Sequence, residues 1–210
     1  MTAATDSRRP RGRPTNVSTG DTVAAVLTSA RRLFAAKGYA GTSNREIAAG
    51  AGLAHTAIYN HFGSKAQLFT AVFLDVQEVL LLELDRSVTA APGEPALPRA
   101  LFDAVEALRK ADPSYVGFLA SMYIEVSRAP ELQEIFAGGA SRFSIVDRLG
   151  ELSAGDGTES GDSEQQLRFW IAFALGLAQL SSLADAETFS ATLDAFRSQF
   201  SIDPCGSGLT

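Results

Sequence analysis

Apolar residues recur every three or four positions along most of the chain, and no segment alternates polar and apolar residues as a half-buried strand does. The first such run comprises Val23, Val26, Leu27, Ala30, Leu33 and Phe34. It predicts one amphipathic helix that starts near Asp21 and ends at Gly38. Similar runs follow to Phe200 and predict about nine helices in all. The sequence therefore predicts an all-α fold.

Two Ser-x-x-Glu/Gln patterns enclose a short unit after the first helix. Ser43 with Glu46 and Ser64 with Gln67 each form a capping box, which marks the start of a helix. Two short helices, over about 44–51 and 55–61, are expected between these starts, joined at Gly52. Such a pair, packed on a preceding helix, is the arrangement of a helix-turn-helix. Its inner side would be Ile47, Ala48, Leu53, Ile58 and Phe62, and its outer side His55, Thr56, Tyr59 and Asn60.

The rest of the chain is expected to be longer helices separated by loops. A long helix begins at Ser64, and the stretch TAAPGEPALP at 89–98 is expected to be a loop. Further helices are expected over 101–110, from Asp112 to Arg128, from Pro130 to Gly138, over 141–152, from Ser163 to about Leu183, and after Asp185.

Charge is distributed unevenly between the two parts of the chain. Residues 1–70 hold nine Arg or Lys against three Asp or Glu, a formal +6. Because the whole chain has 18 basic and 24 acidic residues, the other 140 hold nine against 21, or −12. A basic head on an acidic body suggests a module that binds a polyanion, although a solvated charged face gives the same count.

Reactive or metal-binding side chains are scarce. The single cysteine, Cys205, lies in a Pro/Gly/Ser-rich tail, so no disulfide or CxxC site is expected and the chain is expected to be intracellular. His55 and His61 lie about 240° apart on a helix, which does not suit a shared metal. The longest apolar stretch, 167–180, is too short for a membrane span of about 20 residues. We therefore expect no enzyme activity, no cofactor and a cytoplasmic location.

The stretch from Val26 to Val72 resembles the DNA-binding domain of the TetR family of one-component transcriptional regulators. The resemblance rests on a string of short motifs at fixed spacing. They are Leu33-Phe34, Gly38-Tyr39, Thr42-Ser43, Ile47-Ala48, Ala51-Gly52-Leu53, Ile58-Tyr59, His61-Phe62 and Ser64-Lys65. The resemblance implies a homodimeric regulator whose partners are double-stranded DNA and a small-molecule effector.

The resemblance also implies a set of DNA contacts. Thr42 and Ser43 would bind a phosphate at a helix start, and Tyr59 and Lys65 would hold the backbone on the other side. The residues expected to face base edges are His55, Thr56, Ala57 and Asn60, with Arg45 reaching phosphate or guanine and His61 either packing at the helix end or touching a base.

Two positions depart from the family pattern. Ala54 stands where Ser or Thr is usual, so the second short helix loses its expected N-cap at a cost of about 0.5–2 kcal/mol unless Thr56 compensates. His55 stands where Lys or Arg is common, so its contact is expected to depend on pH near a reference pKa of ~6.5.

The opening segment is rich in arginine, proline and glycine and is expected to be a flexible arm. Its Arg-Gly-Arg-Pro stretch resembles the core of an AT-hook, in which arginines enter a narrow A·T-rich minor groove. A disordered tail that only supplies charge is the alternative. The arginines concerned are Arg8, Arg9, Arg11 and Arg13.

For the acidic body the resemblance implies a ligand cavity and a dimer interface. Candidate ligand-binding residues are Phe118, Met122, Tyr123, Phe143 and Trp170, although Met and aromatic residues at this spacing are also common in cores. The last two helices would pair with those of a second copy through Ala174, Leu175, Ala178, Phe189, Leu193, Phe196 and Phe200.

The expected organisation is therefore a basic arm over 1–20, a three-helix DNA-binding domain over 21–66, a helical ligand-binding and dimerisation domain over 67–203, and a disordered tail over 204–210. The function expected is that of a repressor, released from a palindromic operator by a largely apolar small molecule. The alternative is a helical ligand-binding or structural dimer that does not bind DNA.

Overall fold

The computed structural model describes residues 19–90, 96–138, 147–148, 150–151 and 163–200, and every regular element within these ranges is a helix. The elements are α1 (Thr19–Lys37), α2 (Asn44–Gly50), α3 (Thr56–Phe62), α4 (Lys65–Ala90), α5 (Ala96–Ala111), α6 (Ser114–Arg128), α7 (Pro130–Ala137), α9 (Ser163–Leu183) and α10 (Ala186–Phe200). The expected all-α fold is confirmed.

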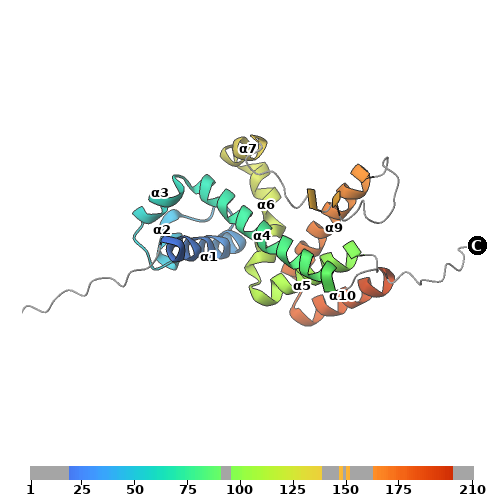
Figure 1. Ribbon diagram of the computed structural model, residues 1–210. Helices are drawn as coiled ribbons and strands as arrows, with labels where there is room; N and C mark the ends of the chain where they lie inside the picture. The colour runs from blue at the N-terminus through green and yellow to red at the C-terminus, as the bar shows by residue number, and fades with distance from the viewer. Residues whose placement is uncertain (1–18, 91–95, 139–146, 149, 152–162, 201–210) are drawn as a thin grey trace, which may run out of the picture.

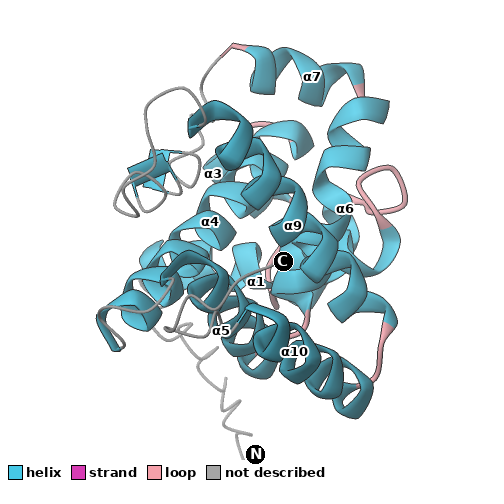
Figure 2. Cartoon of the chain, turned by 90° about the vertical axis from the view of Figure 1, so that its right-hand side faces the viewer, coloured by secondary structure: helices cyan, strands magenta, loops and turns pink. Residues whose placement is uncertain are grey.

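The helices form a small head and a larger body that share the long helix α4. Figure 1 shows α1, α2 and α3 gathered at one end, with α4 running from them into the body. The body is built from α5, α6, α9 and α10, and α5 lies against both α4 and α10. In Figure 2, α7 stands at the far end of α6, away from α10.

Two clusters of buried side chains hold these parts together. The first contains Phe34, Ile47 and Phe69 of the head region together with Phe118 and Met122 of α6. The second lies within the body and includes Leu84, Phe102, Trp170, Phe189 and Leu193. The hydrophobic core of the head is therefore completed by a body helix.

Helix starts follow the capping signals of the sequence. The backbone N–H of Glu46 donates to Ser43 Oγ at 3.2 Å, and the N–H of Ser43 donates to Glu46 Oε2 at 3.0 Å, which is a complete capping box. Gln67 donates its N–H to Ser64 Oγ at 3.1 Å. Asp185 accepts the N–H of Thr188 at 2.8 Å and so caps α10.

The structure corrects some expected boundaries. Helix α1 begins at Thr19, two residues earlier than expected, and α5 begins at Ala96 instead of 101. Pro98 does not prevent this earlier start, because the first turn of a helix has no internal acceptor for its N–H groups. Of the helix expected over 141–152, residues 147, 148, 150 and 151 are helical, and the others lie outside the described residues.

None of the helices in the described ranges is both long and apolar enough to span a membrane.

Candidate DNA-binding site

Helices α2 and α3 form the helix-turn-helix that the sequence predicts. Ile47, Ala48 and Ile58 are at most 1% exposed and hold the pair against α1 and α4. Gly52 occupies the turn with a φ of 69°, a conformation that side chains with a Cβ rarely adopt. The N–H of Leu53 then donates to Ala48 O at 2.9 Å and closes the turn.

The opposite side of α3 is open to solvent. His55, Thr56, Asn60 and His61 are exposed, Ala57 is partly exposed, and Tyr59 is 51% exposed. The rings of His55 and Tyr59 meet edge to face, with centroids 5.3 Å apart. Tyr59 is therefore not a core aromatic, and α3 presents a continuous polar and aromatic face.

The start of α3 has no side-chain cap. His55 occupies the cap position with helical φ and ψ of −53° and −33° and forms no side-chain capping bond. The N–H of Ala57 donates instead to the carbonyl of Ala54 at 2.9 Å. The start of α3 therefore lacks the side-chain cap that Ser or Thr at position 54 would supply, and Thr56 does not supply one either.

An ion pair adds to the capping box at the start of α2. Lys37 Nζ lies 2.7 Å from Glu46 Oε1, and Ser43 Oγ donates to Glu46 Oε2 at 2.8 Å. The hydrogen bond from Lys37, followed by that from Ser43, lowers the pKa of Glu46 to about 2. Ser43 remains exposed at this helix start, beside the exposed Arg45.

Thr42 and Lys65 face the loop between α1 and α2 instead of solvent. Thr42 is 2% exposed, and its hydroxyl donates to Gly38 O at 2.8 Å. Lys65 Nζ donates to Tyr39 O at 2.9 Å and to Thr42 O at 3.1 Å, and lies 4.2 Å from the centroid of the Tyr39 ring. This geometry argues against a phosphate contact by the Thr42 side chain, because buried loop carbonyls need donors of their own.

The +6 charge of the head is therefore not all available to a polyanion. Arg31, Arg32, Lys37 and Lys65 all bind carboxylates or carbonyls within the protein. Among the basic residues of the head that the structure describes, Arg45 alone is exposed with no ion pair. The arm arginines Arg8, Arg9, Arg11 and Arg13 lie outside the described residues.

A buried arginine joins the head to the body, and sequence reasoning missed it. Arg31 is 4% exposed; its Nη2 lies 3.1 Å from Asp112 Oδ2, its Nε donates to Ser114 Oγ at 2.9 Å, and its guanidinium lies 3.5 Å from the centroid of the Tyr115 ring. Asp75 of α4 adds a longer contact at 3.6 Å. The signal that could have found it is spacing, because Arg31 lies four residues after Leu27 and three before Phe34, on the apolar side of the helix.

Burial and pairing act in opposite directions on the two carboxylates of this cluster. Burial alone would raise the pKa of Asp112, but hydrogen bonds from Ser114, Arg32 and Arg31 hold it well below its usual value. The pKa of Asp75 is raised, because burial outweighs the attraction of Arg31. Asp112 is therefore the main counter-charge of Arg31.

The expected ligand-binding residues that the structure describes are divided between the two core clusters and the surface. Phe118 and Met122 are at most 1% exposed and pack in the first core cluster, whereas Trp170 belongs to the second. Tyr123 is 40% exposed, and Phe143 lies outside the described residues. Phe118 and Met122 are thus part of the core, which is the alternative that their helical spacing left open.

The expected dimer residues are also divided. Ala178, Phe189 and Leu193 are at most 2% exposed and pack within one protomer, and the Phe196 ring stacks on Phe102 at 6.0 Å. Ala178, Phe189 and Leu193 therefore leave almost no surface for a second copy, whereas Phe196 is partly exposed. Ala174 and Leu175 are partly exposed, and Phe200 lies at the end of α10.

The apolar side chains that α9 leaves exposed are different ones. Phe169 is 53% exposed and Leu183 82% exposed, and a Cβ added at Gly176 would meet no atom within 4 Å. The small and apolar positions Phe169, Ala172, Gly176 and Leu183 thus follow one outer face of α9.

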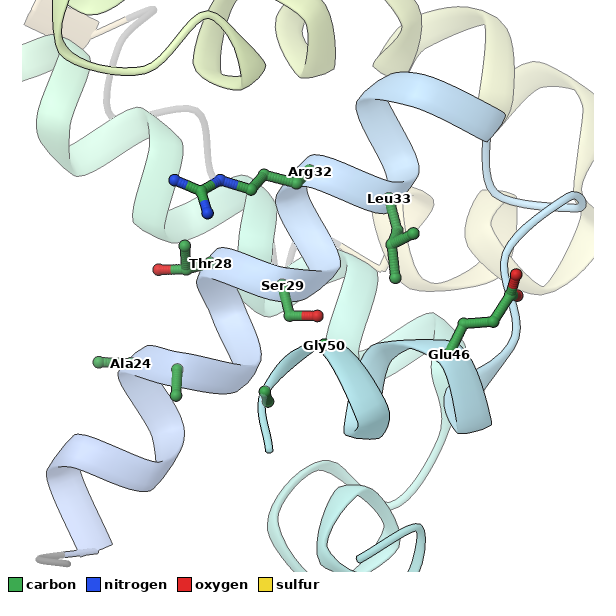
Figure 3. A pocket seen from close by; sticks show the side chains of 9 residues that line it. Ala24, Thr28, Ser29, Arg32, Leu33, Glu46 and Gly50 are labelled. Atoms are coloured by element: carbon green, nitrogen blue, oxygen red, sulfur yellow. The ribbon is translucent and has the colours of Figure 1, made fainter. Parts of the chain in front are cut away.

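A shallow groove lies between α1 and α2, with a volume of about 620 Å³. Figure 3 shows Ala24, Thr28, Ser29, Arg32 and Leu33 on its α1 side and Glu46 and Gly50 on its α2 side. Gly50 lets the two helices approach closely, because a Cβ there would lie 2.4 Å from Ser29 Oγ. In the described part of the chain, no group of His, Cys, Asp or Glu is arranged to hold a metal ion.

These features define a helix-turn-helix protein with an all-helical body. The sequence pattern of the family described as "Bacterial regulatory proteins, tetR family" matches residues 26–72, which cover the last part of α1 through the first part of α4. This match shows that residues 26–72 have the sequence pattern of the TetR-family DNA-binding domain.

Relatives agree with this assignment. The chain is 30% identical over 143 residues to the HTH-type transcriptional regulator EthR of Mycolicibacterium smegmatis, covering 66% of this chain and 63% of that one. It is 44% identical over 70 residues to an HTH-type transcriptional repressor of Mycobacterium tuberculosis, covering 33% and 34%. The chain thus spans less than two thirds of the length of either relative.

Solved structures share the fold. The fatty acid degradation regulator FadR of Bacillus halodurans superimposes with a TM-score of 0.66 at 16% identity, covering 87% of this chain and 96% of that one.

Proposed function

We propose that this chain is a sequence-specific DNA-binding transcriptional regulator that acts as a homodimer. The observation that carries the proposal is the exposed face of α3, where His55, Thr56, Tyr59 and Asn60 stand opposite the buried Ile58. In a helix-turn-helix, the second helix enters the major groove with such a face toward the bases.

Each exposed side chain of this face suits one kind of contact. Asn60 has the amide that pairs with adenine, and the methyl groups of Thr56 and Ala57 suit contact with a thymine methyl. Ser43, Arg45 and Tyr59 would reach phosphates, which fix the register without reading sequence. Lys65 contributes indirectly, because its ammonium holds the loop in front of α2.

The homodimer would form through the outer face of α9, where Phe169 and Leu183 are exposed and Gly176 allows close approach of a second helix. Two copies related by a two-fold axis would place their α3 helices in successive major grooves, about 34–36 Å apart. The operator is then a palindrome.

We further propose that the protein is a repressor that a small, largely apolar molecule releases from DNA. The relative in Mycobacterium tuberculosis is named a repressor, and the FadR structure is named a regulator of fatty acid degradation. Linkage requires that the ligand and the operator weaken each other's binding by the same factor.

A gel-shift assay on the DNA upstream of the protein's own gene tests the proposal. We expect a complex that survives competitor DNA and weakens with salt, and Asn60→Ala should lose the preference for the specific site. Glu134→Ala, at an exposed position of α7, is the matched control. If the wild-type protein forms no competitor-resistant complex, the alternative of a helical dimer without DNA binding is supported. The ion pairs that Arg31, Arg32 and Lys37 form within the protein favour this alternative, because they reduce the positive charge available to DNA.

A further inference from the structure

The loop between α1 and α2 is held by the body as well as by the head. This loop, residues 38–43, leads directly into α2 at Asn44. Lys65 binds it from the start of α4. From the other side, Glu125 of α6 accepts the backbone N–H of Tyr39 at 3.0 Å through Oε2.

The contact with Glu125 is closely fitted. Gly38 has a φ of 73°, and a Cβ at this position would lie 2.5 Å from Glu125 Oε1. The carboxylate therefore occupies the space of a side chain at Gly38. Glycine is favoured there by the backbone conformation, and a Cβ would in addition force the Glu125 carboxylate to move.

A second carboxylate acts on the same residue. Tyr39 is 5% exposed, and its hydroxyl forms a hydrogen bond with Glu131 at the start of α7. Burial, and then this hydrogen bond and the charge of Glu131, raise the pKa of the Tyr39 hydroxyl. Tyr39 is thus held at its amide by α6, at its hydroxyl by α7 and at its carbonyl by α4.

Helix α6 contacts α1 along its length, but with unequal strength. In its first turn, Ser114 and Tyr115 bind the buried Arg31, and Gly117 comes close enough to α1 that an added Cβ would lie 3.3 Å from Ala35 Cβ. Near its last turn, the half-buried Glu125 makes one hydrogen bond with the loop. A shift of α6 would therefore pivot near Arg31 and open first at Glu125.

We propose that Glu125 and Glu131 form a latch through which the α6–α7 corner positions the helix-turn-helix, separately from the connection through α4. The latch rests on the proposed function and describes its regulation: a change in the body that moves α6 releases the loop and lets α2 and α3 change orientation. Because α6 also contacts α9, where Gln179 Nε2 binds the carbonyl of Ala120, the latch is connected to the outer face of the body.

Three full-length variants test the latch. Glu125→Ala removes the acceptor of the Tyr39 amide, Glu125→Gln keeps an acceptor oxygen without the charge, and Glu134→Ala removes an exposed carboxylate of the same corner. Hydrogen exchange over residues 38–43 is measured in each. We expect exchange in Glu125→Ala to be about tenfold faster or more, with Glu125→Gln close to wild type and Glu134→Ala unchanged.

Affinity for a duplex selected by the wild-type protein from a random library is measured in parallel. We expect Glu125→Ala to bind it about tenfold more weakly, within the usual range of coupling between sites, with binding restored to within about twofold in Glu125→Gln. Unchanged exchange in Glu125→Ala would overturn the latch, and faster exchange with unchanged affinity would overturn its role in positioning. A wild-type protein that selects no DNA would refute the proposed function, and the exchange comparison would then decide the latch by itself.

Discussion

Replacing Asp112 with alanine should destabilise the protein by about 3 kcal/mol, because it leaves the buried charge of Arg31 without its main partner. Asp112 accepts hydrogen bonds from Arg31 at 3.1 Å, from Arg32 at 3.0 Å and from the N–H of Ser114 at 3.0 Å. Breaking a buried ion pair costs about 3–5 kcal/mol. The lower end applies here, because Asp75 at 3.6 Å and the Tyr115 ring remain.

Removing the other partner should cost less. In Arg31→Met, Asp112 keeps its bonds from Arg32 and from the N–H of Ser114, and a side chain of similar length fills the core. We expect a loss of about 1–2 kcal/mol. Lys110→Ala is the control. The Lys110 side chain is 73% exposed and pairs with Glu106, so its loss should change stability by less than about 0.5 kcal/mol.

Urea denaturation measures the three variants. The midpoint should fall by about 1 M or more in Asp112→Ala, and by less in Arg31→Met, with the slope m unchanged. If Arg31→Met is as unstable as Asp112→Ala, the asymmetry argued from Arg32 and Ser114 is incorrect. If both lose less than about 1 kcal/mol, the cluster does not hold the head to the body as described.

Three further predictions concern the head, the arm and the body. The pKa of Glu46 is lowered from 4.5 to about 2, so the ionised carboxylate stabilises the protein above pH 4.5, and this effect is lost as the pH falls to about 2. The melting temperatures of wild type and Glu46→Gln should therefore converge over this range, and a constant difference would contradict the assignment. Deletion of residues 1–14 should weaken DNA binding and reduce its salt dependence by up to ~3–4 phosphate contacts, whereas an unchanged salt slope would remove the arm from the mechanism. Leu183→Glu should shift the protein toward monomers in analytical ultracentrifugation, while the control Leu82→Glu, at a 58% exposed position of α4, should not; equal effects of the two would exclude the α9 interface.

Local signals made the head largely predictable from the sequence. The capping box of Ser43 and Glu46, the turn at Gly52 and the outward side of α3 depend on residues close together in the chain, and the structure has all of them. Periodicity also identified Ile58 as an inward position.

The partners of long side chains could not be predicted in the same way. A pattern shows which side of a helix is apolar, but not whether a neighbouring helix or a second copy covers it. The seam of Phe189 and Leu193 was therefore assigned to a dimer, although α5 and α9 cover it within one protomer. The acceptors of Lys65 and Arg31, Tyr39 O and Asp112, lie 26 and 81 residues away in sequence, so no local pattern identifies them.

The core shared by α1, α4 and α6 has a consequence for how the protein unfolds. Phe118 and Met122 close the same cluster as Phe34 and Phe69, and Tyr115 and Leu119 pack against both clusters. A fragment ending at residue 90 would expose the aromatic rings that α6 covers, so the helix-turn-helix should not be an autonomous folding unit. The domain boundary expected near residue 66 does not separate two hydrophobic cores, and thermal unfolding should cross it in one cooperative step.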